Sequence, residues 1–184
     1  MPEIDLTDIT LRAKNGDSAA AGELYEQCHQ DIYWYLFYRV GDVQTAEDLT
    51  SEVFLRMLRG LPNYQPQGKP VEAWLFQIAR NLAIDHYRSN HHEESIEMKE
   101  NQLVEPGEVH NTVENSLNGE KLRRALEQLS ADQRDVIILR FVLRMPIAEA
   151  ARTINRSQDA VKALQRRGLL ALRDLLANWE VSYA

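Results

Sequence analysis

The stretch PIAEAARTINRSQDAVKALQRR, residues 146–167, contains the features that best indicate the fold. Its first part predicts a short helix, residues 147–153, and its last part predicts a longer helix that begins near Ser157. Between them, Asn155 stands at a turn position that calls for a positive φ, which Asn tolerates better than most residues. Three alanines in the first helix leave room for the two helices to cross closely. This order of elements is typical of a helix-turn-helix.

The longer helix divides into an apolar face and a basic face. Apolar or small residues recur at helical spacing from Val161 to Leu172, and this side is expected to face the core. On the other side, Lys and Arg can donate to guanine O6 and N7 in a major groove, and Ala163 can touch a thymine methyl. The start of a helix also attracts phosphate. The residues predicted to contact duplex DNA are Arg156, Ser157, Gln158, Asp159, Lys162, Ala163, Arg166 and Arg167.

The net charge of −7 conceals an uneven distribution along the 184 residues. Residues 1–90 hold 8 Lys or Arg against 13 Asp or Glu, residues 91–120 hold 1 against 8, and residues 121–184 hold 12 against 7. A basic C-terminal third on an otherwise acidic chain is typical of a nucleic-acid-binding segment joined to a segment with a different role. The alternative is a solvated basic face on an ordinary core helix, but the turn residue, the alanines and the charge together favour DNA binding.

The rest of the chain also follows a helical period, and no segment alternates as a strand would. Residues 91–118 are acidic and poor in aromatic residues, so they cannot bury enough apolar surface to offset the entropy of ordering. We therefore predict an all-α protein of two small helical domains, 1–90 and 119–184, joined by an acidic flexible linker, 91–118. Helices are expected near 7–14, 17–40, 44–60, 71–90, 119–129, 131–143, 147–153 and 157–178.

Two of these helices are expected to begin at capping boxes. Residues 45–48 read Thr-Ala-Glu-Asp and residues 130–133 read Ser-Ala-Asp-Gln. In a capping box the first and last side chains satisfy each other's backbone N–H groups. We therefore expect Thr45 and Ser130 to be N-caps.

The expected helix 44–60 has an apolar stripe, from Leu49 to Leu61, with Phe54 and Leu58 beside it. Its other side is charged and carries a single apolar residue, Leu55. A lone exposed Leu among charges is common on ordinary surfaces. One apolar anchor with a charged rim is also typical of a protein-docking surface. The helix taken alone favours the first interpretation, an ordinary surface.

The expected helix 71–90 places polar and basic side chains on an arc beside its apolar stripe. The preceding loop, NYQPQGKP, is too rich in Pro, Gly and Gln to be helical and carries an aromatic and a basic residue that we expect to be exposed. Aromatic and basic groups placed in this way can hold an unstacked base of single-stranded DNA. The residues concerned are Tyr64, Lys69, Gln77, Arg80, Asn81 and Arg88.

Several of these segments, in this order, resemble the bacterial RNA polymerase sigma factors of the small extracytoplasmic-function (ECF) group. AEDLTSEVFLRM (46–57) resembles the polymerase-binding helix, LPNYQPQGKP (61–70) the base-capturing loop, and WLFQIARNLAIDHYR (74–88) the helix that reads the promoter element nearest the start site. LEQLSADQRDVIILRF (126–141) and residues 146–167 resemble the module that reads the upstream element.

The resemblance implies a function in transcription initiation. The chain would bind core RNA polymerase at the clamp coiled coil of its largest subunit, direct it to promoters, read the upstream element as duplex and hold the downstream element as an opened single strand. It implies no cofactor, and an anti-sigma factor as a common further partner. It also implies a cytoplasmic protein, associated with the nucleoid when active. The residues implied in polymerase binding are Asp48, Ser51, Glu52, Leu55 and Arg59.

Two other classes of function are considered. The first is a stand-alone dimeric helix-turn-helix repressor or activator, which would bind two-fold half-sites without polymerase. The second is an enzyme. Adjacent residues such as those of the His91–Glu94 cluster cannot all face one metal ion in a helix, and no nucleophile elbow or phosphate loop is found. The single Cys28 excludes an internal disulfide, and no apolar run is long enough for a membrane span. We expect no catalysis and no metal.

Overall fold

The computed structural model describes residues 6–65, 70–94 and 117–181, and within these ranges every regular element is helical. The predicted all-α fold class is confirmed. The elements are α1 (Leu6–Lys14), α2 (Ser18–Val40), α3 (Val43–Gly60), the 3₁₀ turn η1 (Leu61–Asn63), α4 (Val71–Glu94), α5 (Leu117–Glu127), α6 (Ala131–Ile137), the π-helical turn η2 (Ile138–Val142), α7 (Ile147–Thr153) and α8 (Gln158–Val181).

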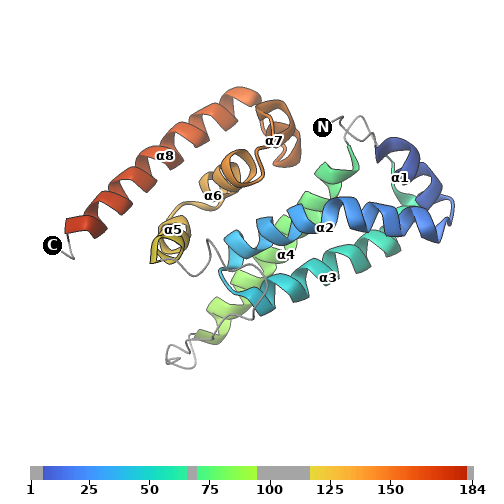
Figure 1. Ribbon diagram of the computed structural model, residues 1–184, viewed down its shortest axis with the longest axis horizontal. Helices are drawn as coiled ribbons and strands as arrows, with labels where there is room; N and C mark the ends of the chain where they lie inside the picture. The colour runs from blue at the N-terminus through green and yellow to red at the C-terminus, as the bar shows by residue number, and fades with distance from the viewer. Residues whose placement is uncertain (1–5, 66–69, 95–116, 182–184) are drawn as a thin grey trace.

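The N-terminal half is a bundle of α1 to α4 (Figure 1). Helices α2 and α3 form an antiparallel pair, because Gly41 at the end of α2 has φ of 80° and reverses the chain. Only a residue without a Cβ adopts that conformation at little cost. Helix α4 packs against both α2 and α3, and fully buried side chains such as Leu24, Val53 and Leu75 fill the space between them.

One of the two expected capping boxes is present. Ser130 is the N-cap of α6: its Oγ accepts from the backbone N–H of Gln133 at 3.4 Å, and the Gln133 Oε1 accepts from the Ser130 N–H at 3.1 Å. The prediction for Thr45 is wrong. Helix α3 already begins at Val43, and its N-cap is Asp42, whose carboxylate accepts from the Thr45 N–H at 2.7 Å. Asp is as effective an N-cap as Ser.

The helix expected over residues 131–143 is interrupted by the π-helical turn η2. Four consecutive apolar residues, Val136 to Leu139, are each at most 4% exposed, so this segment is surrounded by protein on all sides. Ile137 belongs to the cluster formed with α5 and α8, whereas its neighbours on both sides belong to the larger cluster shared with the N-terminal half. The wider π turn holds more residues than an α-helical turn, so the side chains after it point in a different direction relative to those before it.

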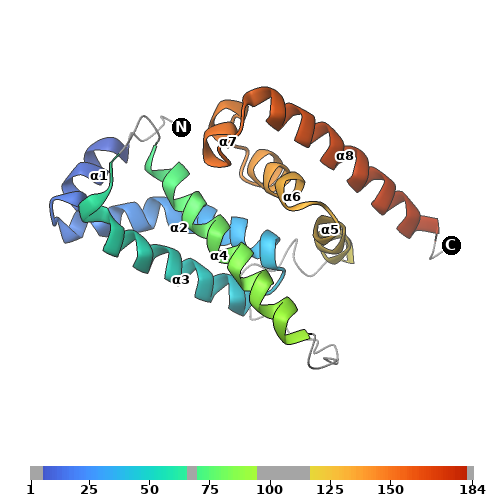
Figure 2. The same ribbon diagram turned by 180° about the vertical axis from the view of Figure 1, so that it is seen from behind.

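The two halves of the chain pack against each other and share one hydrophobic cluster. Ile138, Leu139 and Ala150 lie in the same cluster as Leu36 and Ala79 of the N-terminal bundle. Helix α7 contacts α4, and η2 contacts α2 (Figures 1 and 2). At the expected linker, 91–118, α4 extends to Glu94 and α5 begins at Leu117. Residues 95–116 lie outside the described residues.

Candidate nucleic-acid interface

The helix-turn-helix predicted from residues 146–167 is present as α7 and α8. Thr153 and Ile154 are buried at the end of α7, and Asn155 has φ of 54°. The Arg156 N–H donates to the Ala151 carbonyl at 2.9 Å and closes the turn. Helix α8 then begins at Gln158, where the Ser157 Oγ accepts from the Ala160 N–H at 3.2 Å. Ser157 is therefore the N-cap of α8, and the helix begins where the sequence predicts.

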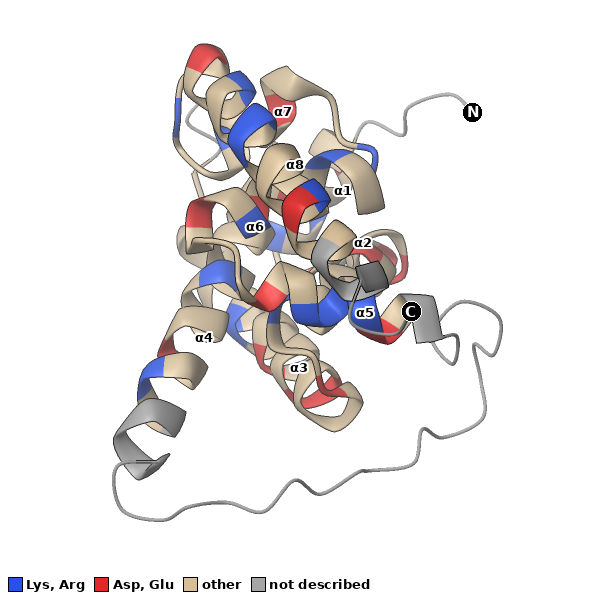
Figure 3. Cartoon of the chain, turned by 90° about the vertical axis from the view of Figure 1, so that its left-hand side faces the viewer, with Lys and Arg blue, Asp and Glu red and all other residues tan. Residues whose placement is uncertain are grey.

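The eight residues predicted to contact duplex DNA are all exposed along the turn and the first half of α8. The opposite face is inside, where Val161, Gly168 and Leu172 are buried. A Cβ built on Gly168 would lie 3.0 Å from Ile137 Cγ1, so the missing side chain lets α8 approach α6 closely. Basic residues occupy successive turns of α8 (Figure 3), with Lys162 paired to Asp159 at 3.3 Å. Such an exposed basic helix has the shape and donors for a major groove.

The residues assigned to polymerase binding lie along one face of α3. Asp48, Ser51, Leu55 and Arg59 are exposed, and Glu52 is half-buried beside Arg56, with which it forms a 2.8 Å ion pair. Leu55 is 47% exposed and Leu58 is 50% exposed, so Leu58, expected beside the inward stripe, is part of the surface. Helix α3 packs on α2 and α4, on the side of the bundle away from α8 (Figures 1 and 2).

The residues assigned to single-stranded DNA are only partly brought together. Gln77, Asn81 and Arg88 are exposed on α4. Arg80, one turn from Gln77, is instead directed at α6, and its side chain is only 26% exposed. Lys69 lies outside the described residues.

The expectation that Tyr64 is exposed is wrong. Its ring packs on Trp74 with centroids 4.7 Å apart, and the residue is 9% exposed. Burial, followed by the charge of Glu72, raises the pKa of its phenol. The loop turns the ring inward because Trp74, on the first turn of α4, offers a large apolar surface to cover. Lys14 fixes the loop by donating to the Tyr64 carbonyl at 2.7 Å.

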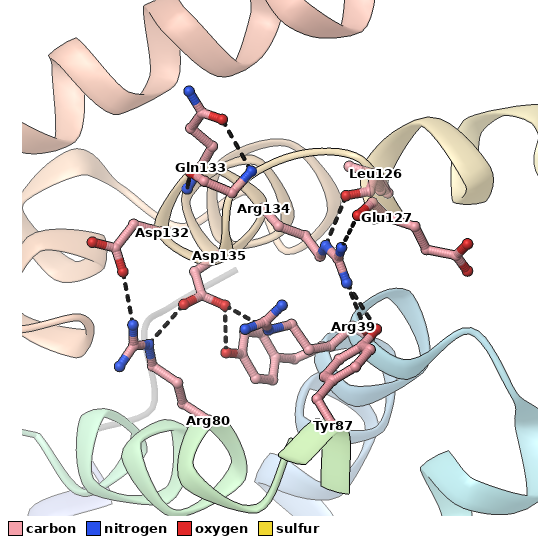
Figure 4. Close-up of polar contacts among 11 residues, drawn as sticks. Arg39, Arg80, Tyr87, Leu126, Glu127, Asp132, Gln133, Arg134 and Asp135 are labelled. Carbon is pink, nitrogen blue, oxygen red and sulfur yellow. Dashed lines mark hydrogen bonds and ion pairs between the residues drawn. The ribbon is translucent and has the colours of Figure 1, made fainter. Parts of the chain in front are cut away.

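Arg80 belongs to a charged cluster around Asp135 of α6, which has no exposed surface (Figure 4). The Asp135 carboxylate accepts from Arg80 Nε at 2.7 Å and from the Tyr35 hydroxyl at 2.8 Å, and it lies 3.0 Å from Arg39 Nε. Burial, and then the charge of Asp135, raise the pKa of Tyr35 well above its usual value. Burial alone would lower the pKa of Arg80, but the hydrogen bond and charge of Asp135 outweigh it and the pKa is raised.

A second group of contacts between the two halves of the chain centres on Arg134, which is also buried on α6 (Figure 4). Its guanidinium donates to the Tyr87 hydroxyl at 2.8 Å, to the Arg39 carbonyl at 3.1 Å and to the Leu126 carbonyl at 2.7 Å. The Tyr87 hydroxyl in turn donates to the Arg39 carbonyl. The Tyr87 ring also lies against the guanidiniums of Arg39 and Arg134, at 5.7 and 5.6 Å. The buried Arg134 guanidinium therefore has hydrogen-bond acceptors, as burial requires, and the buried Arg39 guanidinium is balanced by the charge of Asp135, although its Nε makes no hydrogen bond to any described residue.

The contacts of Asp135 and Arg134 between the two halves were not predicted from the sequence. The one local signal was the pair Arg134-Asp135 directly before four buried apolar residues, because charges rarely stand in such a position unless they are paired. The partners of Asp135 lie 55 to 100 residues earlier in the chain, so no helical spacing connects them.

Other kinds of site are not found in the described ranges. Within them, no group of three His, Cys, Asp or Glu side chains is placed to hold a metal ion. In the same ranges, no helix is both long and apolar enough to cross a bilayer.

Comparisons with known proteins cover nearly the whole chain. Residues 24–93 match the family described as Sigma-70 region 2, and residues 119–172 match Sigma-70 region 4. The ECF RNA polymerase sigma factor BldN of Streptomyces coelicolor is 37% identical over 177 residues, 94% of this chain and 66% of BldN, so the chain spans slightly less than two thirds of that relative. The ECF RNA polymerase sigma factor SigX of Bacillus subtilis is 36% identical over 160 residues, 82% of this chain and 80% of SigX.

Two solved structures share the fold. CnrH in complex with the cytosolic domain of CnrY has a TM-score of 0.73 at 21% identity, over 96% of this chain and 99% of that one. The sigma factor RpoE of Bartonella quintana, solved with the anti-sigma factor NepR, has a TM-score of 0.67 at 23% identity, over 85% and 96%. Sigma-70 region 2 matches the N-terminal bundle, and region 4 matches the C-terminal helices that include the helix-turn-helix. The match to SigX covers most of the length of both proteins. The chain belongs to the ECF group of RNA polymerase sigma factors.

Proposed function

We propose that this sigma factor binds core RNA polymerase through α3 and reads a two-part promoter through α8 and α4. The observation that carries the proposal is that these three surfaces are separate and differ in chemistry: a basic recognition face on α8, polar side chains on α4, and two exposed leucines in a charged rim on α3. A polymerase-dependent DNA reader needs all three kinds of surface, whereas a simple repressor needs only the first and a dimer face.

The duplex would be read by the first turns of α8. Lys162, Arg166 and Arg167 are exposed and can donate to guanine, while Ser157 and the first N–H groups of α8 suit a phosphate. The opened strand would lie along α4, on Gln77, Asn81 and Arg88. Unstacking a base costs a few kcal/mol. Contacts with the captured strand and with polymerase would have to offset that cost.

The polymerase partner would be the clamp coiled coil of the largest subunit. Asp48 and Glu52 offer acidic groups, Arg59 a basic one, and Leu55 an apolar anchor on the same face of α3. An apolar centre within a polar rim is the usual layout of a protein–protein interface. We further propose that the protein works at the nucleoid in the bacterial cytoplasm, that it catalyses no reaction of its own, and that an anti-sigma factor restrains it.

The experiment is a reconstitution with purified core RNA polymerase and a library of promoter-like duplexes. We expect the chain alone to bind duplex DNA weakly, to bind core polymerase tightly, and to select promoters only as the holoenzyme. Tight two-fold binding to DNA without affinity for polymerase would reject the proposal in favour of a dimeric repressor or activator.

A further inference from the structure

Two arginines that the sequence predicts to contact DNA are held by carboxylates of α6. Arg80 belongs to the α4 surface and Arg156 to the turn before α8. Both guanidiniums are paired to one carboxylate, that of Asp132 on α6: Arg80 Nη2 lies 2.8 Å from its Oδ1, and Arg156 Nη2 lies 2.9 Å from its Oδ2. One carboxylate thus pairs with a cation from each predicted DNA-reading surface.

Asp135, one turn along α6, strengthens the hold on Arg80. Its Oδ2 accepts from Arg80 Nε at 2.7 Å, so the Arg80 guanidinium is bound on two of its nitrogens by two carboxylates of α6 (Figure 4). Carboxylate pairs of this kind present oxygens to arginine much as a phosphate does. In this arrangement Arg80 cannot contact a DNA strand lying on Gln77 and Asn81.

From this geometry we infer that Asp132 and Asp135 form an intramolecular latch, in which α6 carboxylates occupy the arginines that promoter phosphates would otherwise bind. The inference rests on the proposed function. The shared apolar cluster favours the closed arrangement, and the ion pairs connect its opening to DNA. A phosphate that takes Arg80 removes an anchor between the two halves, whereas Arg156 and Asp132 both belong to the C-terminal half and their pair only occupies a cation. Because only open molecules offer Arg80 to DNA, the apparent DNA affinity is the intrinsic affinity multiplied by the fraction of molecules that are open.

The face of α3 is not part of the latch. Leu55 and Leu58 remain exposed while Arg80 is held, and α3 lies away from α6 and α8 (Figure 2). Polymerase can therefore reach α3 on the closed protein, whereas full contact of α4 with a DNA strand requires α6 to move away. The latch thus predicts an order of events, with polymerase docking before promoter contact.

The test measures the separation of the two halves in the full chain without polymerase. Fluorophores are attached at Gln30→Cys on α2 and Ala177→Cys on α8, both exposed and outside the assigned surfaces, in a Cys28→Ala background. The latch variant is Asp132→Asn with Asp135→Asn. The control is Asp174→Asn, which replaces an exposed carboxylate of α8 by an uncharged amide. Circular dichroism verifies that each variant keeps its helices.

We expect a single short-distance population in the parent chain and in the Asp174→Asn control, and a longer, broader one in the latch variant. Binding to a random duplex at low salt should tighten by about fivefold or more in the latch variant and by less than about twofold in the control. The proposal is overturned if the parent chain is already broad, if the latch variant stays short, or if both variants tighten equally.

A titration of the labelled parent chain with the same duplex provides a second test that needs no latch variant. The distance should lengthen as DNA saturates the protein, and an unchanged distance at saturation contradicts the latch. Failure to bind core polymerase, with distances behaving as expected, counts against the proposed function alone.

Discussion

Arg134 of α6 donates a hydrogen bond to the hydroxyl of Tyr87 on α4 at 2.8 Å, across the boundary between the two halves of the chain. The two residues lie 47 positions apart and belong to different sigma regions. The same hydroxyl donates to the carbonyl of Arg39 at the end of α2. One phenol therefore connects α2, α4 and α6.

Replacing Tyr87 by Phe removes that connection and keeps the ring. We expect the change to lower the free energy of unfolding by about 1 kcal/mol, because Arg134 loses one of its acceptors but keeps the carbonyls. The midpoint of urea unfolding measures the effect. Tyr25→Phe is the control, since Tyr25 is 43% exposed and its ring contacts survive the change. Equal shifts in the two variants would show that the hydroxyl of Tyr87 has no special role.

Polymerase affinity is expected to depend on Leu55 and Glu52. Leu55→Ala removes the apolar anchor and Glu52→Lys reverses a charge on the rim, so each should weaken binding to core polymerase by about tenfold, which corresponds to about 1.4 kcal/mol. Both substitutions are on the surface of α3, so helix content should not change. Titration of labelled protein with core polymerase measures the affinity.

Leu11→Ala is the matched control for Leu55→Ala, because Leu11 is also 47% exposed but lies on α1. It should bind polymerase as the parent chain does. If Leu55→Ala binds equally well, the docking face has been misassigned.

Specific readout of the upstream element is expected to depend on Arg167. Arg167→Ala should cost about 1–3 kcal/mol of discrimination if the guanidinium contacts a base edge. Holoenzyme binding to a set of single-base promoter variants measures it, with Arg173→Ala as a control at a 70% exposed side chain farther along α8. A uniform loss on every sequence, with a smaller salt dependence, would instead assign Arg167 to a phosphate.

The buried thiol of Cys28 predicts a pH dependence of stability. Burial, followed by the charges of Glu72 and Asp31, raises its pKa from 9.0 to about 12. Because the folded protein holds the thiol proton more tightly than the unfolded chain, this contribution is complete below pH 9 and is lost as the pH rises from about 9 toward 12. We expect a loss of about 1.4 kcal/mol at pH 10 relative to Cys28→Ala.

Urea unfolding of the parent chain and of Cys28→Ala between pH 7 and 10 measures that difference. The same thiol should react with an aromatic disulfide reagent in the unfolded chain and hardly at all in the folded one. Rapid labelling of the folded protein at pH 8 would contradict the burial of Cys28.

Local patterns predicted the helices well, because each depends on spacing and caps within a few residues. The helix-turn-helix, the Asn155 turn and the Ser130 cap all follow from their own short segments. Tyr64 and Arg80 show where this reasoning ends. Whether Tyr64 is covered depends on the rotamer of Trp74, and the direction of Arg80 depends on two aspartates more than 50 residues away. Neither partner has a fixed spacing that a sequence pattern could reveal.

The π-helical turn at Ile138–Val142 has a consequence for how this chain tolerates change in length. Removing one residue there would restore ordinary helical winding and rotate α6 by about 100° relative to the helix-turn-helix. Asp132 and Asp135 would then leave Arg80, and the apolar residues of α6 would exchange neighbours between the two clusters. Conservative substitutions keep that phase, so the number of residues in this turn is a constraint separate from the apolar character that the buried Ile138 and Leu139 require.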